Sequence, residues 1–294
     1  MSAQNFVAAL NIHPLKSGRA IPLREARLAY DGLVGDRRFM LVDPDGTAIT
    51  QRTMQALAQV VATPAEDGLD LSFNGETLPV RFPGEADKAA RLSVRIWSST
   101  VDAACADDEA NDVLSGWFAR PVRLVFMDAK AERRVGEAWA GTAAPVGFAD
   151  GFPVLVTTTG SLDAVNRTLA AKGQPAVGMD RFRTNILISN DIAWEEDLWE
   201  AIEIGGIRLD LVKPCERCIM TTQDQMTGER TGGNPIEALA VERMSADRRV
   251  PGVLFGWNAV PRGEGVIAVG DAVRILSRRS EGWPMKRRAA STGT

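Results

Sequence analysis

Short hydrophobic runs, many of them alternating with polar residues, dominate the first half of the chain. The alternation predicts β-strands at REARLAY (24–30), RRFMLVD (37–43), RLSVRIW (91–97) and PVRLVFM (121–127). Asn74-Gly75 lies between two alternating runs within residues 69–82 and predicts a tight β-hairpin. The sequence DPDG (43–46) predicts a turn leading into 47–52. Residues 108–119 have helical spacing with acidic residues in the first turn, so we expect a helix there.

Strands again outnumber helices in the second half. We expect a buried strand at 152–158, a helix at 161–173, a strand at 183–189, a hairpin at 202–214 turning at Gly205-Gly206, and a closing strand pair within 265–276. Residues 128–150 are polar and contain Gly and Ala, which predicts a linker or mobile loop that could form a lid over a site. The end of the chain, 277–294, is basic and rich in small residues, which is typical of disorder.

These elements predict a mixed α/β, β-dominated fold that is barrel-like and divided into two parts. We expect an N-terminal β-barrel-like domain at 1–127 and a second β-barrel domain with a few helices at 128–279. A disordered basic tail at 280–294 would follow.

Composition narrows the function classes. Of the 294 residues, 45% are hydrophobic and 24% charged, as in an ordinary soluble globular protein. The net charge of −4 argues against a nucleic-acid partner, so any anionic ligand must be held by a few well-placed cations. No apolar run approaches the roughly 20 residues that span a bilayer, and the first residues lack the pattern of a signal peptide. Three cysteines suit a reducing compartment, so we expect a cytoplasmic protein without membrane contact.

Two of the three cysteines lie close together in VKPCERCIMTTQDQMTGER (212–230). A zinc site would need Cys105, Cys215, Cys218 and His13 together, and nothing in the sequence brings them together. A thioredoxin-type redox pair would need a helix after the first thiol, whereas the residues that follow are β-branched and turn-like.

Two further interpretations of the pair stay open. Both cysteines could pack as small hydrophobic residues, which suits Cys215 better than Cys218, because Glu216 and Arg217 lie beside Cys218. Alternatively, one thiolate could bind a soft metal carried by a cofactor, with nearby cations holding the anionic part of that cofactor.

The stretch KPCERCIMTTQDQMTG (213–228) resembles the cysteine motif of MOSC-domain proteins, the family named after the C-terminal domain of molybdenum cofactor sulfurase. The chain is most similar to the branch that contains the mitochondrial amidoxime-reducing components and their bacterial relatives. The resemblance covers nearly the whole chain, in the family's order, with matching segments at 12–46, 148–166, 181–189, 254–259 and 269–273. It identifies 1–127 as the MOSC N-terminal β-barrel domain and 128–279 as the MOSC domain.

The resemblance implies that Cys218 is the ligand of molybdenum in a pyranopterin cofactor, molybdopterin, which carries a phosphate. The residues that match positions holding the polar parts of this cofactor are Lys16, Ser17, Arg37, Arg183, Asn185, Arg217 and Asn258. Arg forks, a lysine and a hydroxyl are the donors that a phosphate monoester favours. Strand alternation would put Arg181 and Arg183 on one face, so the sequence does not separate them. Asp224 is as much a turn former as a site residue, and we expect His13 to have a packing role.

The resemblance further implies a molybdenum-dependent reductase that converts small N-hydroxylated compounds to amines. No cysteine follows Cys218 that could hold a [2Fe–2S] cluster, so we expect electrons from a separate ferredoxin-, flavodoxin- or cytochrome b5-type protein. The alternatives are a cofactor carrier and a sulfur-transfer protein, both without reductase turnover. A persulfide on Cys218 would not need the cations in the first half of the chain, which disfavours sulfur transfer.

Overall fold

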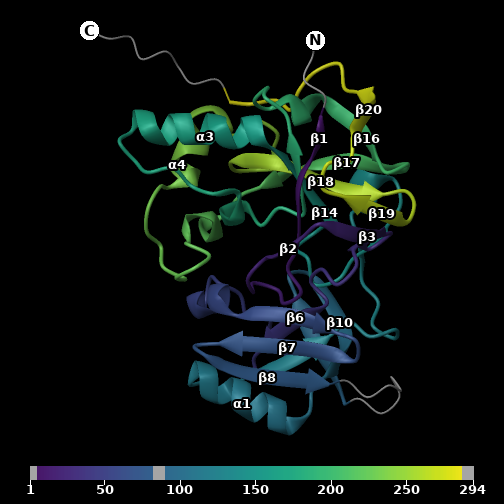
Figure 1. Cartoon of the computed structure of the whole chain (residues 1–294), viewed down its shortest axis with the longest axis vertical. Helices are drawn as coiled ribbons and strands as arrows, with labels where there is room; N and C mark the ends of the chain where they lie inside the picture. Colours follow the sequence, from purple (N-terminus) through teal and green to yellow (C-terminus); the bar gives the residue numbers. More distant parts are fainter. Residues whose placement is uncertain (1–4, 82–89, 287–294) are drawn as a thin grey trace.

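The computed structural model describes residues 5–81 and 90–286, which form two β-rich parts stacked along the long axis (Figure 1). The upper part contains an eight-stranded sheet in the order β2-β1-β15-β14-β18-β17-β16-β20. The bounds of its strands are β1 Phe6–Ile12, β2 Ile21–Leu23, β14 Val154–Thr158, β15 Ile186–Ser189, β16 Trp199–Ile204, β17 Ile207–Glu216, β18 Leu254–Pro261 and β20 Val273–Arg278.

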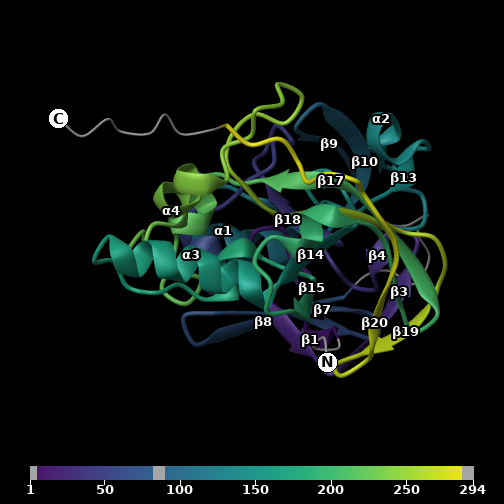
Figure 2. The ribbon, with the colours of Figure 1, turned by 90° about the horizontal axis from the view of Figure 1, so that it is seen from above.

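The upper part closes into a barrel-like body around one core. A second sheet, in the order β19 (Gly265–Ala268), β3 (Glu25–Ala29) and β4 (Gly32–Leu33), adds its buried side chains to the same apolar cluster as the large sheet. β14 and β15 are parallel, and the helix α3 (Thr159–Ala171) lies between them in the chain, as a parallel connection requires. Seen from above, α3 and α4 (Pro235–Glu242) lie on the side opposite β19 and β20 (Figure 2).

Within the described residues, the lower part contains two antiparallel sheets and one α-helix. One sheet has the order β5-β11-β10-β9 and the other β6-β7-β8. The bounds are β5 Phe39–Val42, β6 Val61–Ala65, β7 Gly68–Phe73, β8 Glu76–Arg81, β9 Arg91–Ile96, β10 Ser99–Cys105, α1 Asp108–Phe118 and β11 Arg123–Phe126. Leu57, Leu69 and Leu124 are fully buried in the core between them. The fold is therefore β-dominated with barrel-like parts, as the sequence predicts.

Several local predictions are confirmed. Asn74 and Gly75 both have positive φ, 51° and 85°, and join β7 to β8, as the Asn-Gly pattern requires. Gly205 and Gly206 form the corresponding turn between β16 and β17. The two predicted helices are α1 and α3.

Other predictions are wrong in physically instructive ways. The strand expected at 183–189 begins only at Ile186, because Met179–Phe182 form a 3₁₀ turn, η2, and Arg183 is left-handed. The strands of 265–276 do not pair with each other: β19 pairs with β3, and β20 pairs with β16. The domain boundary at residue 127 stays a prediction. Two sheets cross it, because β1 pairs with β15 and β3 pairs with β19, while β2 and β4 join these sheets through β1 and β3.

The predicted linker at 128–150 carries structure of its own. It contains β12 (Arg134–Val135), α2 (Glu137–Ala140) and β13 (Ala144–Pro145). The buried Arg133 guanidinium donates to the carbonyls of Gly147 and Ala149 at 2.9 and 2.5 Å, which ties the end of the stretch to its beginning.

The tail predicted to be disordered from residue 280 is ordered as far as the structure describes it. Trp283 donates to the Ser245 hydroxyl, and Met285 pairs with the same residue. Residues 287–294 lie outside the described residues. No helix within 5–81 and 90–286 is long and apolar enough to cross a membrane.

Glu196, in the 3₁₀ turn η3 (Glu195–Leu198), is a buried carboxyl that makes stability depend on pH. Its Oε2 lies 2.9 Å from the hydroxyls of Thr158 and Ser161, and its side chain forms no ion pair with any described residue. Burial and the neighbouring Asp197 carboxylate raise the pKa of Glu196 from 4.5 to about 7. Between these two values the folded protein keeps a proton that the unfolded chain releases, so the free energy of unfolding falls as the pH rises.

We therefore expect the wild type to lose about 3 kcal/mol of stability between pH 4.5 and 7 relative to the Glu196→Gln variant, whose amide does not ionise. Urea unfolding of both proteins at pH 5, 6, 7 and 8 measures this difference. A difference that is constant across the series would contradict the raised pKa.

Candidate functional site

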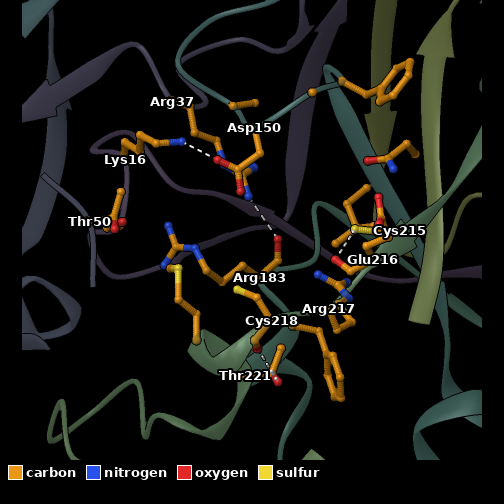
Figure 3. Close-up of a pocket in the computed structure, with 18 of the residues that line it drawn as sticks. Lys16, Arg37, Thr50, Asp150, Arg183, Cys215, Glu216, Arg217, Cys218 and Thr221 are labelled. Carbon is orange, nitrogen blue, oxygen red and sulfur yellow. Dashed lines mark hydrogen bonds and ion pairs between the residues drawn. The ribbon is translucent and has the colours of Figure 1, made fainter. Parts of the chain in front are cut away.

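A cavity of about 590 Å³ lies between the two parts of the molecule. The eight residues that the resemblance assigns to the cofactor or its metal all line it: Lys16, Ser17, Arg37, Arg183, Asn185, Arg217, Cys218 and Asn258. They come from separate segments: the loop after β1, the turn before β5, the residues around η2, the end of β17, and β18. Figure 3 shows Lys16 and Arg37 on one side of this space and Arg217 and Cys218 on the other.

The cavity is strongly electropositive within a chain of net charge −4. Among the described residues, seven lysines and arginines but only two carboxylates, Asp150 and Glu216, line it. Four of these cations form ion pairs: Lys16 with Asp150, Arg37 with Asp36, Arg181 with Asp224 and Lys213 with Glu216. Arg52, Arg183 and Arg217 have no carboxylate partner among the described residues, and their mutual repulsion would be relieved by an anion. The electrostatics therefore favour an anionic ligand.

Cys218 places a thiol at the cavity. It directly precedes the short 3₁₀ turn η4 (Ile219–Thr222), and the Thr221 hydroxyl donates to its carbonyl at 3.1 Å. The Cys218 Sγ accepts a hydrogen bond from Arg52 Nη2 at 3.1 Å. Cys215 lies within β17, and burial raises the pKa of its thiol, which disfavours the thiolate there.

Two interpretations of the cysteine pair lose support. Cys105 lies in β10 of the lower part, and no group of three or more His, Cys, Asp or Glu residues in the described chain could hold a metal ion. The turn after Cys218 has only four 3₁₀ residues, so no α-helix dipole acts on the pair as in a thioredoxin-type site. All three cysteines are free.

Arg37, Arg183 and Asn185 form one connected group. Arg37 Nη1 donates to the Asn185 Oδ1 at 3.0 Å, and Nη2 donates to the Arg183 carbonyl at 3.1 Å. The Asn185 amide also accepts from Leu155 N and donates to the Asn11 carbonyl, so it holds Arg37 against the backbone. Burial and the nearby Arg37 lower the pKa of Arg183 to about 9. Arg183 thus stays cationic at neutral pH in a site short of negative charge.

Lys16 is paired with a carboxylate. Its Nζ donates to Asp150 Oδ1 at 2.6 Å and to the Phe148 carbonyl at 2.8 Å. Burial lowers the pKa of Lys16, although Asp150 opposes this. The Asp150 side chain is 65% exposed. Lys16 and the hydrogen bond from Trp97 hold the pKa of Asp150 below its usual range. The two side chains form an ion pair beside the cavity.

Arg217 has a hydrogen-bond donor that no described residue accepts from. Its Nε donates to the Phe255 carbonyl at 3.0 Å, and its guanidinium lies over the Phe182 ring, 5.4 Å from the centroid. Its Nη2 is buried and has no hydrogen-bond partner within residues 5–81 and 90–286. Because an unsatisfied buried donor is costly, this nitrogen indicates a ligand atom that belongs in the cavity.

Arg181 lies within the 3₁₀ turn η2, whereas Arg183 follows that turn in a left-handed conformation. It donates to the Thr222 and Thr231 carbonyls and pairs with Asp224 at 3.2 Å. Asp224 in turn accepts from the backbone N–H groups of Met226 and Thr227, so it forms a turn. The expectation that Arg181 and Arg183 share one strand face is wrong, and Arg181 fixes the segment after η4.

Backbone strain gathers at the cavity. In the described chain, seven residues other than glycine have positive φ, and four of them line this space: Ser17, Arg37, Trp97 and Arg183. Such conformations are held only where the surrounding structure enforces them, and they are enriched at functional sites.

The remaining sequence candidates have modest roles. Asn258 Nδ2 lies 3.5 Å from the Pro214 carbonyl, a weak contact that leaves the amide facing the cavity. His13 is buried, its backbone N–H donates to Asp36 Oδ1 at 2.7 Å, and it does not line the cavity. Sequence reasoning missed Arg52, Trp97 and Asp150, which lie in turns and carry no local pattern.

The sequence matches the MOSC N-terminal beta barrel domain over residues 4–121 and the MOSC domain over residues 143–274. It is 30% identical to mitochondrial amidoxime-reducing component 1 of Danio rerio over 277 residues, which is 91% of this chain and 83% of that protein. The human protein of the same name is 30% identical over 92% of this chain and 83% of its own length. A molybdenum cofactor sulfurase of Drosophila grimshawi is 26% identical over 91% of this chain but only 34% of its own. The chain thus belongs to the family of MOSC-domain proteins that carry a MOSC N-terminal β-barrel domain.

Proposed function

We propose that the cavity binds the molybdenum cofactor, with Cys218 as the ligand of the metal. Lys16, Ser17, Arg37, Arg183, Asn185, Arg217 and Asn258 would hold the polar and anionic parts of the cofactor. The observation that carries this proposal is the meeting of a free Cys218 thiol with seven cationic side chains, one of which has a buried, unpaired donor. A soft thiolate beside hard cations fits a group that combines a soft metal with a phosphate.

The proposed reaction reduces an N-hydroxylated compound to the corresponding amine or amidine. For an amidoxime, R–C(NH₂)=N–OH, two electrons and two protons give R–C(NH₂)=NH and water, so the N–O bond breaks and the nitrogen is reduced. The bound cofactor supplies the two-electron chemistry. The residues of this chain hold the anion, orient the Cys218 sulfur through Arg52 and limit access to the metal. The names of the amidoxime-reducing relatives support this reaction over others.

A separate electron-transfer protein of the ferredoxin, flavodoxin or cytochrome b5 type would supply the electrons. Free thiols that are few in number suit a reducing compartment, so we place the reaction in the cytoplasm.

The test is elemental and pterin analysis of the protein purified from a molybdenum-replete host, followed by reduction of benzamidoxime with a strong artificial electron donor. Near-stoichiometric molybdenum and formation of benzamidine are expected. Zinc instead of molybdenum, or no metal, would overturn the assignment. Bound molybdenum without turnover would favour a cofactor carrier, and labile sulfur on Cys218 would favour sulfur transfer.

A further inference from the structure

A tryptophan and an arginine from the lower part of the molecule meet the Cys218 thiol at the cavity. Trp97 lies in the turn between β9 and β10, and Arg52 lies in a turn shortly before the 3₁₀ helix η1 (Gln55–Gln59). The guanidinium carbon of Arg52 lies 4.7 Å from the centroid of the Trp97 ring. The same guanidinium donates to the Cys218 Sγ at 3.1 Å. One planar group therefore contacts both the indole and the sulfur, which fixes their separation.

The indole is held from a second direction as well. Trp97 Nε1 donates to Asp150 Oδ1 at 3.1 Å, and that carboxylate is itself held by Lys16. Trp97 also has a φ of 54°, a conformation that bulky residues rarely adopt. These contacts fix the ring rather than leave it free to rotate.

This fixed ring is nevertheless largely uncovered. Trp97 is 59% exposed and lines the cavity. An aromatic side chain that is fixed by polar contacts at its edge and at one face, but left open to a cavity, presents an apolar face to a ligand. Arg52 and Asp150 flank this face and offer hydrogen-bond donors and an acceptor.

We propose that Trp97 and Arg52 form a stacking platform for the flat, conjugated part of the substrate and determine substrate specificity. This inference rests on the proposed reductase function and names the substrate class of the same site. The Arg52 guanidinium covers one face of the Trp97 ring, so a flat group stacks on the opposite face, and Trp97 lines the same cavity as Cys218. Flat aryl amidoximes are therefore preferred over aliphatic ones.

The test compares kcat and KM for benzamidoxime and acetamidoxime in four molybdenum-loaded proteins: wild type, Trp97→Ala, Trp97→Phe and Tyr30→Ala. The Trp97→Ala variant is expected to lose about tenfold of the preference for benzamidoxime, mainly through KM. Trp97→Phe keeps a ring and retains most of the preference. Tyr30 is the matched control, since it is 50% exposed and does not line the cavity.

A binding measurement separates this inference from the proposed function. Calorimetric titration with benzamide and acetamide, which are not reduced, measures the affinity of the platform for a flat and a small amide in the absence of turnover. We expect benzamide affinity to fall about tenfold in Trp97→Ala and to persist in Trp97→Phe. Unchanged benzamide affinity and unchanged selectivity in Trp97→Ala would overturn the platform. A wild type that lacks molybdenum or reduces neither amidoxime would contradict the proposed function instead, while benzamide binding still decides the role of Trp97.

Discussion

Cys218→Ser protein from a molybdenum-replete host is expected to contain about tenfold less molybdenum than the wild type, or less still. Cys218 is the cysteine whose sulfur meets the cationic guanidinium of Arg52 at the cavity. A serine hydroxyl keeps the size of the side chain but replaces the soft sulfur with a hard, protonated oxygen. The anion-binding cations remain, so the variant separates metal ligation from binding of the phosphate.

Cys215→Ser is the matched control. Among the described residues its thiol donates only to the Glu216 carbonyl, at 3.7 Å, and desolvation raises the pKa of this half-buried thiol, which disfavours a thiolate. Inductively coupled plasma mass spectrometry of both variants, after identical purification, gives the molybdenum content per chain. Equal molybdenum in the wild type and Cys218→Ser, or loss in Cys215→Ser alone, would contradict the assignment of Cys218.

Asp197→Ala is expected to destabilise the fold by about 3–5 kcal/mol. Asp197 in η3 accepts two hydrogen bonds from Arg243, at 2.7 and 3.0 Å, and one from the indole of Trp257 at 2.8 Å. Both partners of the ion pair are nearly fully buried, at 6% and 8% exposure. Removing the carboxylate leaves a buried guanidinium without its counter-ion, and that desolvated charge is the main cost.

The control for this prediction is Asp247→Ala, which breaks a pair with the solvent-exposed Arg249. Exposed pairs contribute little, so this variant should leave the urea midpoint nearly unchanged. Equilibrium urea unfolding of both variants, with the slope of each transition compared, measures the difference. Similar urea midpoints for the two variants would contradict the expectation that breaking the buried Asp197–Arg243 pair destabilises the fold more than breaking the Asp247–Arg249 pair.

Local sequence patterns predicted turns and helices well, but they predicted poorly which strands pair across the chain. Asn74-Gly75 and Gly205-Gly206 need positive φ whatever surrounds them, so both hairpins could be read from the sequence. The alternation over 183–189 predicted a strand from its first residue. Arg183 instead ends the 3₁₀ turn η2 in a left-handed conformation, and Arg37 donates a hydrogen bond to the Arg183 carbonyl. That contact joins residues far apart in sequence and leaves no periodic signal.

The same distinction applies to the cavity. Resemblance to MOSC proteins identified Cys218 and the cations, and the structure brings all of them to one space. Arg52, Trp97 and Asp150 were missed because their significance arises only from mutual distances. In sequence each is an ordinary turn residue. Asn185 was identified, but its hydrogen bonds to Arg37 and the backbone could not be foreseen from spacing.

The pairing of β1 with β15 and of β3 with β19 determines the order in which the chain can fold. Leu10 pairs with Ile186, and Leu28 pairs with Gly265, so these contacts join residues that are very far apart in the sequence. The lower part, from β5 to β11, is complete on the ribosome long before those partners emerge. Until then β1 and β3 have unpaired edges that need protection from aggregation. The upper barrel closes last, and the cavity is complete only when β15, β17 and β18 have joined the first strands. Binding of the proposed cofactor therefore requires that β15, β17 and β18 have already folded onto the first strands.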